Sequence, residues 1–290
     1  MGKCIVFGMA GQDGTYLGEL LRARGHLVYG VSRSTEGDVA NRHYVETIVK
    51  DIAPDYVFHL AANSTTRHEA LFENHETIST GTINLLESVR VHAPRCRVFI
   101  TGSGVQFVNH GLPISEKDAF SPSSLYAVAR IQSVYAARYY RSLGLKVYIG
   151  YLFHHESPLR KPNHLCKKIS EFAKLVRQGH QGQLVLGNIA VRKEVAFAGD
   201  IVAGIWTLVN QDVVFEAAIG TGIAYSIEEW VNACFSIIGE DWHKHVRVES
   251  DNFVSEYPIL VSNPETIFSL GWSPHISFDE LAVMMIRGSC

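Results

Sequence analysis

The chain has 290 residues, of which 47% are hydrophobic and 19% charged, with a formal net charge of -3. This balance is typical of a globular protein with a sizeable core, and it calls for neither a nucleic acid nor an anionic membrane as partner. The five cysteines form no CxxC pair and the fourteen histidines no HExxH motif, so we expect no disulfide framework and no metal site.

No apolar run approaches the roughly 18 residues that a membrane span needs. The first residues are typical of a strand and lack the basic segment and long apolar stretch of a secretion signal. We therefore expect a cytoplasmic protein.

In the N-terminal half, short apolar runs alternate with amphipathic segments. The runs predict strands at residues 3–7, 27–31, 56–61, 97–101 and 146–152. The amphipathic segments predict helices at residues 15–24, 40–51, 69–92 (one long helix or two broken ones) and 123–143. Such alternation implies right-handed crossovers and a doubly wound parallel sheet of the Rossmann type.

After residue 155 the alternation becomes less regular, and no repeat or low-complexity linker is present. Helices are predicted at residues 167–178, 199–210, 226–238 and 278–286. We predict a Rossmann domain over residues 1–155 and a smaller α/β cap over mainly residues 156–290, with some cap segments returning to the first domain.

A glycine-rich turn follows the first predicted strand and leads into the first helix. Its glycines are Gly8, Gly11 and Gly14, with Gln12 and Asp13 between the last two. Glycines in this strand–turn–helix context let a pyrophosphate approach backbone N–H groups at a helix N-terminus. A plain turn would need one glycine, so three predict a dinucleotide site.

The end of the second predicted strand bears on the choice of cofactor. An acidic residue there would bind the ribose 2′-hydroxyl of NAD, but this segment contains Arg33 between Ser32 and Ser34. A guanidinium flanked by hydroxyls suits a 2′-phosphate, so NADP is predicted. Asp38 is placed to cap a helix or to contact the adenine, and Ala61, which ends the third predicted strand, is another expected cofactor contact.

Several segments resemble the GDP-mannose 4,6-dehydratases, which belong to the extended short-chain dehydrogenases/reductases. They are GMAGQDGTYLGEL (8–20), YAVAR (126–130), LFHHESP (152–158), LGNIAVRKEVAFAGD (186–200) and GWSP (271–274). The resemblance spans nearly the whole chain. It implies that the Rossmann domain binds the cofactor, that the cap binds a nucleotide sugar, and that the sugar is oxidised at C4.

The resemblance also assigns catalytic positions. Tyr126 matches the tyrosine that exchanges a proton with the sugar hydroxyl, and Ser103 matches the Ser/Thr position. Arg130 replaces the family's lysine, which holds the nicotinamide ribose, and is therefore expected to contact the cofactor; it keeps the charge but not the ability to share a proton. The glutamate that dehydratases use for water loss falls at Val105, or at Gln106 if the register slips by one, and neither can act as a carboxylate.

Cations and polar residues of the second half are expected to contact the substrate. Arg192 and Lys193 suit a diphosphate, because a guanidinium or an ammonium binds phosphate oxygens. The resemblance adds His154, which replaces a family asparagine, together with Glu156 and Lys167.

The stretch after Thr35 is shorter than in the family, where it reaches a neighbouring subunit and completes a tetramer. We therefore expect a homodimer, formed by the helical segments 73–91 and 123–143 across a two-fold axis. The helical spacing of Tyr139, Tyr140 and Phe172 predicts that all three lie in the core.

These features favour an NADP-dependent oxidoreductase acting on a nucleotide sugar, either a 4-keto reductase or an epimerase, with a GDP-linked sugar as its substrate. One alternative is a true 4,6-dehydratase with a relocated acid–base group such as His154. Another, motivated by Arg130, is a catalytically weak protein that binds NADP and a nucleotide sugar.

Overall fold

A computed structural model of the 290-residue chain describes residues 1–33, 37–63, 65–249 and 257–288. Its centre is a six-stranded parallel sheet in the order β10-β5-β4-β3-β1-β2. The strands are β1 (Lys3–Phe7), β2 (Leu27–Val31), β3 (Tyr56–His59), β4 (Arg97–Ser103), β5 (Lys146–Leu152) and β10 (Glu216–Ile219). The predicted Rossmann-type sheet is therefore present, and a strand from the C-terminal half completes one edge.

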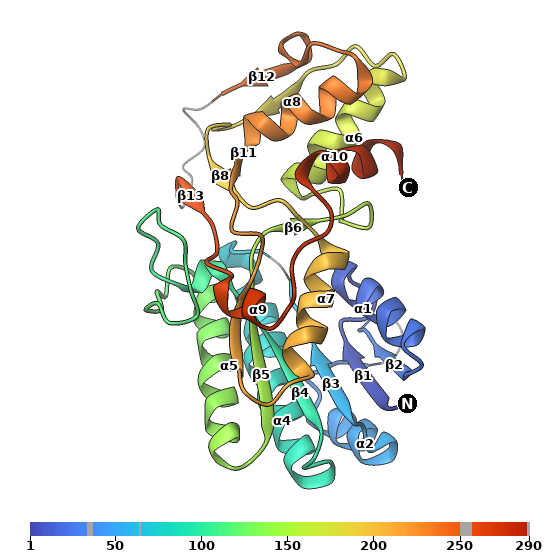
Figure 1. The fold of residues 1–290 in the computed structure, drawn as a ribbon, viewed down its shortest axis with the longest axis vertical. Helices are drawn as coiled ribbons and strands as arrows, with labels where there is room; N and C mark the ends of the chain where they lie inside the picture. The colour runs from blue at the N-terminus through green and yellow to red at the C-terminus, as the bar shows by residue number, and fades with distance from the viewer. Residues whose placement is uncertain (34–36, 64, 250–256, 289–290) are drawn as a thin grey trace.

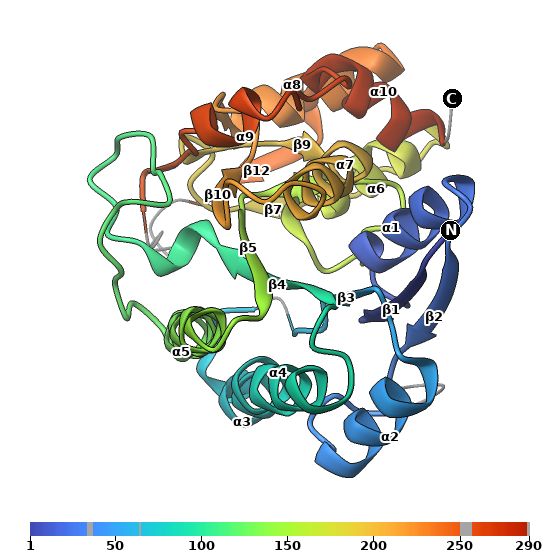
Figure 2. The same ribbon diagram turned by 60° about the horizontal axis from the view of Figure 1, so that its bottom comes forward.

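Helices cover both faces of this sheet (Figure 2). One face carries α1 (Gln12–Ala23) and α7 (Ala198–Val209), which contact each other. The other carries α2 (Arg42–Ile52), α4 (Gly81–His92) and α5 (Leu125–Ser142). Each face has its own apolar core, and burying both faces explains why the strands are almost continuously hydrophobic.

The smaller cap lies beyond the carboxyl ends of the strands (Figure 1). Its helices α6 (Leu165–Arg177), α8 (Ile227–Ile238) and α10 (Phe278–Arg287) pack around a third apolar core. Ser226 and Ser277 begin α8 and α10 with capping boxes closed by Glu229 and Glu280.

The strands of the cap are short. They are β6 (His155–Glu156), β7 (Leu184–Leu186), β8 (Arg192–Lys193), β9 (Ala196–Phe197), β11 (Tyr225–Ser226), β12 (Val246–Val248) and β13 (Ile259–Leu260). They pair into sheets of two or three strands, of which β8 with β11 and β13 is the largest among the described residues. Segments far apart in the sequence thus meet around β8.

The predicted helix over residues 69–92 is one helical run of several types. It comprises the 3-10 turn η1 (His68–Ala70), α3 (Leu71–Asn74), the π-helical turn η2 (His75–Thr80) and α4. The remaining short elements are η3 (Gly104–Gln106), η4 (Trp242–Lys244) and α9 (Glu265–Ser269).

Three sequence expectations need correction. α1 begins at Gln12 rather than residue 15, because the last part of the glycine turn is already helical. Asp38 caps no helix: its carboxylate accepts a hydrogen bond from the Ala40 N–H, and Asn41 caps α2. Tyr139 is 61% exposed on α5 and does not belong to the core, whereas Tyr140 and Phe172 are buried as expected.

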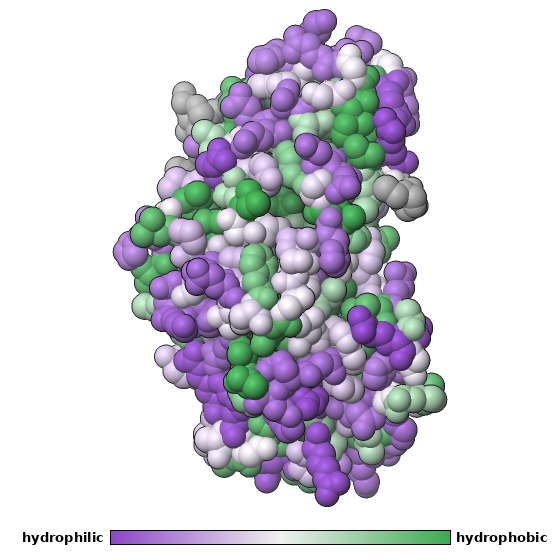
Figure 3. Space-filling view, viewed as in Figure 1, coloured by the Kyte–Doolittle hydropathy of each residue, from purple (hydrophilic) through white to green (hydrophobic). Residues whose placement is uncertain are grey.

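Among the described residues, β2 is the last strand on its side of the sheet, and the chain leads from it through residues 32–41 into α2. No described helix is both long and apolar enough to cross a bilayer. The face seen in Figure 3 is mostly hydrophilic, with apolar side chains in several separate patches.

Candidate active site

A cavity lies between the carboxyl ends of the central strands and the cap. Its wall is formed by residues from the first glycine turn, the ends of β3 and β4, the start of α5 and the segment after β5. They include Gly8, Gly11, Gln12, Asp13, Gly14, Ser103, Val105, Tyr126, Arg130, His154, His155 and Arg160. Open α/β sheets bind ligands at this edge, so the fold itself selects the position.

The glycine turn leaves no room for a side chain at Gly8 or Gly14. Gly8 has a φ of 93°, and a Cβ there would lie 2.7 Å from the Ala61 backbone nitrogen. A Cβ on Gly14 would lie 2.2 Å from the Gly8 carbonyl oxygen. The turn therefore packs against the first turn of α1 and the end of β3, at a helix N-terminus suited to a phosphate.

The two motifs that resemble the dehydratases most specifically contact each other. The Ser157 hydroxyl donates to Gln12 Oε1 at 2.8 Å, and His155 Nε2 lies 2.9 Å from Asp13 Oδ1. His155 Nδ1 lies 2.7 Å from the Phe153 carbonyl oxygen. Because both neighbours of the ring are acceptors, this geometry favours the imidazolium form, which donates from both nitrogens. These contacts hold residues 155–157 of the cap against the glycine turn.

The pKa directions of this buried pair agree with that geometry. Burial opposes the charged form of each partner, but the charge of His155 and its hydrogen bond lower the pKa of Asp13 to about 2. Burial likewise lowers the pKa of His155, and the Asp13 carboxylate outweighs it, so the net shift is upward. The pair is therefore an internal ion pair.

Tyr126 and Arg130 lie one helical turn apart at the start of α5, which Ser124 caps. Arg130 Nε donates to the Tyr126 hydroxyl at 3.2 Å, and its guanidinium carbon lies 5.2 Å from the centre of the ring. A second donor, Nη1, bonds the Thr101 carbonyl oxygen at 2.6 Å. Arg130 is only 3% exposed, so its charge acts on the phenol with little screening by water.

The resemblance offers Val105 or Gln106 for the position of the dehydratase glutamate, and the loop after β4 places these two side chains differently. The Gln106 side chain is fully buried, and its Oε1 accepts from the Ser103 N–H at 2.8 Å. The Ser103 hydroxyl accepts from the Gln106 backbone in return. Val105, not Gln106, lines the cavity with Ser103 and Tyr126, so the wall here carries an aliphatic side chain.

A second cavity adjoins the glycine turn on the side of β2. It is lined by Arg33, Asp38, Ala61 and Lys161 among others. Arg33 forms an ion pair and hydrogen bond with Glu73, whose other oxygen accepts from Asn63 at 2.7 Å. Arg33 thus stands at this cavity already paired with a carboxylate. Ser34 and Thr35, which would flank it, lie outside the described residues.

The predicted substrate residues separate into two groups. His154 lines the main cavity, and Lys193 lines a neighbouring cavity with Lys168 and Tyr257. Glu156, Lys167 and Arg192 line neither of these two cavities.

The three other residues have different surroundings. Glu156 is completely buried, and the Lys167 ammonium bonds the Pro158 carbonyl oxygen at 3.0 Å and Glu171 at 2.7 Å. Arg192 is half exposed and bonds the Ala224 carbonyl oxygen at 2.8 Å, with Glu229 at 3.2 Å. The charges of Lys167 and Arg192 are therefore already matched by protein groups, whereas neither Glu156 oxygen accepts a hydrogen bond from a described residue.

Sequence reasoning missed several residues of the cavity walls. Arg160 and Thr66 line the main cavity, Lys161 the cofactor-side cavity, and Lys168 the cap cavity. Arg160 and Lys161 follow the HESP segment almost directly, so a search for cations after that motif could have found both. Thr66 carried no comparable signal in the sequence.

Comparisons with known proteins identify the family of the chain. The sequence pattern of the family described as GDP-mannose 4,6 dehydratase matches residues 33–285. GDP-mannose 4,6 dehydratase 1 of Arabidopsis thaliana is 30% identical over 323 aligned residues, covering 97% of this chain and 88% of the relative. GDP-mannose 4,6-dehydratase of Yersinia enterocolitica is 28% identical, covering 99% and 94%.

Solved structures share the fold at lower identity. RMD from Pseudomonas aeruginosa, complexed with NADPH, has a TM-score of 0.86 at 19% identity and covers 99% of this chain and 98% of its own. UDP-glucose 4-epimerase of Thermus thermophilus, complexed with NAD, has a TM-score of 0.82 at 21% identity and covers 99% and 100%. With the matched family pattern, these findings place the chain in the GDP-mannose 4,6-dehydratase family of extended short-chain dehydrogenases/reductases.

Proposed function

We propose that the protein is an NADP-dependent oxidoreductase of nucleotide sugars that acts at C4 of the sugar without eliminating water. Either a 4-keto reductase or an epimerase fits this description, with a GDP-linked sugar as substrate. The observation that carries the proposal is a cavity lined by the Tyr126–Arg130 pair and by Val105, the residue that the resemblance aligns with the dehydratase carboxylate.

Tyr126 is the proton donor or acceptor for the oxygen on C4. Arg130 donates a hydrogen bond to that phenol and so orients its hydroxyl for proton exchange. The bond from Arg130 to the Thr101 carbonyl oxygen fixes the guanidinium, so the phenol has a defined position. NADP(H), when bound along the glycine turn, supplies or accepts the hydride.

Elimination of water from a 4-keto sugar needs a group that removes a proton at C5 and delivers one to the C6 hydroxyl. Val105 has no proton to exchange, and Gln106 is buried away from the cavity. His154 Nε2 is already engaged with Glu156 and Cys166, at 3.0 and 3.6 Å. These arrangements favour redox chemistry at C4 over dehydration.

The preference for NADP rests on Arg33, which lines the cofactor-side cavity together with Lys161. A 2′-phosphate would compete with Glu73 for the Arg33 guanidinium. A phosphate carries more negative charge than a carboxylate and offers three acceptor oxygens, so the exchange favours the phosphate. The diphosphate of the sugar nucleotide is assigned to the cations Arg160, Lys168 and Lys193.

A direct test is to incubate the protein with NADPH and GDP-4-keto-6-deoxymannose, and separately with NADP and GDP-mannose, and to identify the products by mass spectrometry. Reduction adds two hydrogens to the keto sugar, and epimerisation changes retention without changing mass. Loss of water from GDP-mannose would instead establish a dehydratase. Binding without any turnover would establish a non-catalytic protein.

We also infer a homodimer formed by the helical segment 73–91 and by α5. Large apolar and aromatic side chains are exposed there, including Tyr139 at 61%, Tyr135 at 59%, Val91 at 52% and Ile83 at 51%. Burying such side chains against a second copy stabilises an assembly by removing apolar area from water. Light scattering tests this proposal, and a monomer or a stable tetramer would contradict it.

A further inference from the structure

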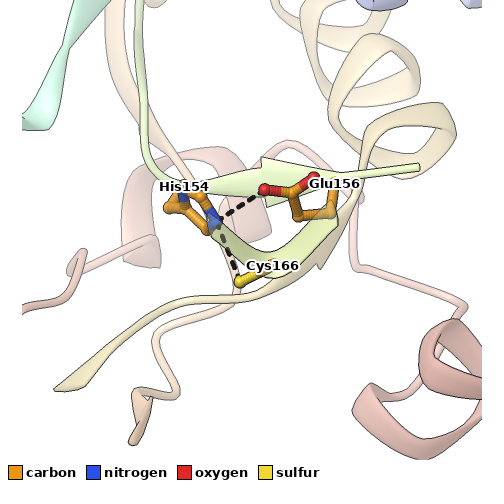
Figure 4. Close-up of side chains that lie close together, drawn as sticks. All are labelled: His154, Glu156 and Cys166. Atoms are coloured by element: carbon orange, nitrogen blue, oxygen red, sulfur yellow. Dashed lines mark hydrogen bonds and ion pairs between the residues drawn. The ribbon is translucent and has the colours of Figure 1, made fainter. Parts of the chain in front are cut away.

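Three potential metal ligands meet where the cap joins the main cavity. His154 lies between β5 and β6, Glu156 in β6 and Cys166 in α6 (Figure 4). One donor atom of each lies within 4.8 Å of the other two. The sequence spacing, H-x-E followed by a distant cysteine, gave no sign of such a cluster. It arises because β6 and the first turn of α6 face each other.

Hydrogen bonding does not satisfy this cluster. His154 Nε2 faces both Cys166 Sγ at 3.6 Å and Glu156 Oε1 at 3.0 Å, and a single ring nitrogen can carry only one proton. Among the described residues, neither oxygen of the fully buried Glu156 accepts a hydrogen bond of good geometry. A buried carboxylate without donors is costly, so a neutralising partner is missing.

The neighbouring cations neutralise the Glu156 carboxylate only in part. Arg160 Nε lies 3.8 Å from Glu156 Oε2, the oxygen that does not face His154. Burial raises the pKa of Glu156, and the charges of Arg160 and Lys193 offset only part of that shift. His154 directs Nε2 toward both of the other side chains, so that nitrogen is placed to act as a ligand.

We propose that His154, Glu156 and Cys166 form a zinc site. Zinc bonds of about 2.0 Å to nitrogen and about 2.3 Å to sulfur, at a tetrahedral angle, put these two ligands about 3.5 Å apart. The observed separation of His154 Nε2 and Cys166 Sγ is 3.6 Å. Rotation of the Glu156 side chain sets the distances from its ligating oxygen to His154 Nε2 and to Cys166 Sγ.

The chemistry of the donors selects this metal. Thiolate, imidazole and carboxylate together suit Zn²⁺ rather than Mg²⁺ or Ca²⁺, which prefer oxygen ligands. Burial raises the pKa of the Cys166 thiol to about 12, so binding must displace its proton. The thiolate and the Glu156 carboxylate then balance the double charge of the ion. Water completes the fourth position of the tetrahedron.

The site is tested by metal content and by a cobalt spectrum. The full-length protein is purified without chelators and analysed by mass spectrometry for metals. It is then stripped and titrated with Co²⁺, which reports a bound thiolate through a near-ultraviolet charge-transfer band. We expect one zinc per chain, and on titration one cobalt with that band. Absence of both, in protein that binds NADPH normally, would overturn the proposal.

The matched variants are Cys166→Ser and Cys96→Ser, since both thiols are buried but Cys96 precedes β4, at the opposite end of that strand from the cavity. Cys166→Ser should abolish the charge-transfer band and weaken metal binding at least about 10-fold, because even the loss of an indirect contact to a metal ligand typically costs that much. Cys96→Ser should leave both unchanged.

His154→Asn is the second variant, to be used if Cys166→Ser fails to fold. It should weaken metal binding while leaving the NADPH site at the glycine turn intact. An unchanged cobalt spectrum in either variant would mean that the ion binds elsewhere, and the assignment would be wrong.

Discussion

The central sheet and the cap are built on different principles. The sheet has strands of four to seven residues, mostly buried except for the edge strand β2, and a register that runs evenly across neighbours. The cap strands have two or three residues and pair with distant segments. The sheet side contributes the glycine turn, Tyr126 and Arg130 to the cavities, and the cap side contributes charged and imidazole side chains.

This difference distinguishes the features that suit any dinucleotide from those that can select a particular substrate. Backbone turns at strand ends suit any dinucleotide, because they offer N–H groups and space rather than particular side chains. Cations on irregular segments can be exchanged without disturbing a core, so they can set the choice of substrate. The ion pair of Asp13 and His155 and the bond of Ser157 to Gln12 connect the two parts.

The largest effect on turnover is expected for Tyr126→Phe. This variant tests whether a residue contributed by the Rossmann-type half performs the proton exchange. The ring still packs under the Arg130 guanidinium, but the proton exchange is lost. Turnover of a 4-keto sugar with NADPH should fall by at least about 10²–10⁴, the usual contribution of a positioned acid–base group. NADPH affinity, measured by fluorescence titration, should stay nearly constant.

The control for that experiment is Tyr135→Phe, on the same helix but 59% exposed and outside the cavity. It should behave as the unmutated protein. Turnover of Tyr126→Phe within a few-fold of the unmutated rate would remove Tyr126 from the mechanism.

A gain of function is expected for Val105→Glu, which places a carboxylate on the cavity wall. If the substrate lies as the proposed function requires, the variant should eliminate water from GDP-mannose faster, by on the order of 10². Mass spectrometry of the sugar product measures the rate. Efficient elimination by the unmutated protein, at several turnovers per second, would show instead that another group already serves as the acid.

Cofactor preference should respond to both members of the ion pair beside β2. Arg33→Ala removes a charge-assisted contact worth about 1.5–3 kcal/mol, so the preference for NADPH over NADH should drop roughly 10- to 100-fold. Glu73→Gln should have the opposite sign, because it removes the carboxylate that competes for Arg33.

Isothermal titration with both cofactors measures these preferences. Arg95→Ala, an exposed arginine just before β4, should leave the ratio unchanged. Equal affinity of the unmutated protein for the two cofactors would contradict the proposed preference for NADP.

The smallest expected effect concerns the stability of the sheet alone. Glu216 in β10 receives hydrogen bonds from Arg138 at 2.7 and 2.9 Å, from Tyr151 at 2.7 Å and from Arg141. Burial raises the pKa of Glu216, but these donors outweigh it and the net shift is downward. The ionised form is thus favoured in the folded state.

A lowered folded pKa means that this contribution is present above the unfolded pKa and is lost as the pH falls through the folded value. Glu216→Gln should lower the free energy of unfolding by about 2 kcal/mol at neutral pH, and by less in acid. Urea unfolding at several pH values measures the difference. A loss that is equal at all pH values would show that packing, not charge, is responsible.

Much of the Rossmann-type half was predictable because its signals are local. The strands of residues 3–7, 27–31 and 146–152 were located to the residue, since each is a short apolar run between turns. The glycine spacing predicted the turn at the carboxyl end of β1. Helix ends were less well placed, because Gly11 rather than a polar side chain begins α1.

The substrate side was less predictable for a physical reason. Lys193 was expected beside a cavity and lines one, but Arg192 is its neighbour on a strand and points to Glu229 instead. Adjacent strand residues face opposite sides, and a two-residue strand has no periodicity from which to choose the side. Lys167 likewise bonds a backbone carbonyl and Glu171, partners that no motif specifies, and Glu156 is buried outside both cavities.

The sequence by itself determined the parallel sheet, the dinucleotide turn and the family, because these depend on hydrophobic periodicity, glycine positions and contiguous motifs. Only the tertiary structure decided that Val105 and not Gln106 faces the cavity, that Arg33 is paired with Glu73, and that His154, Glu156 and Cys166 converge. Each of these depends on contacts between segments far apart in the chain or on the exact path of a loop. A pattern of residues along the chain carries no information on such contacts until the packing of the sheet and the cap has fixed their positions.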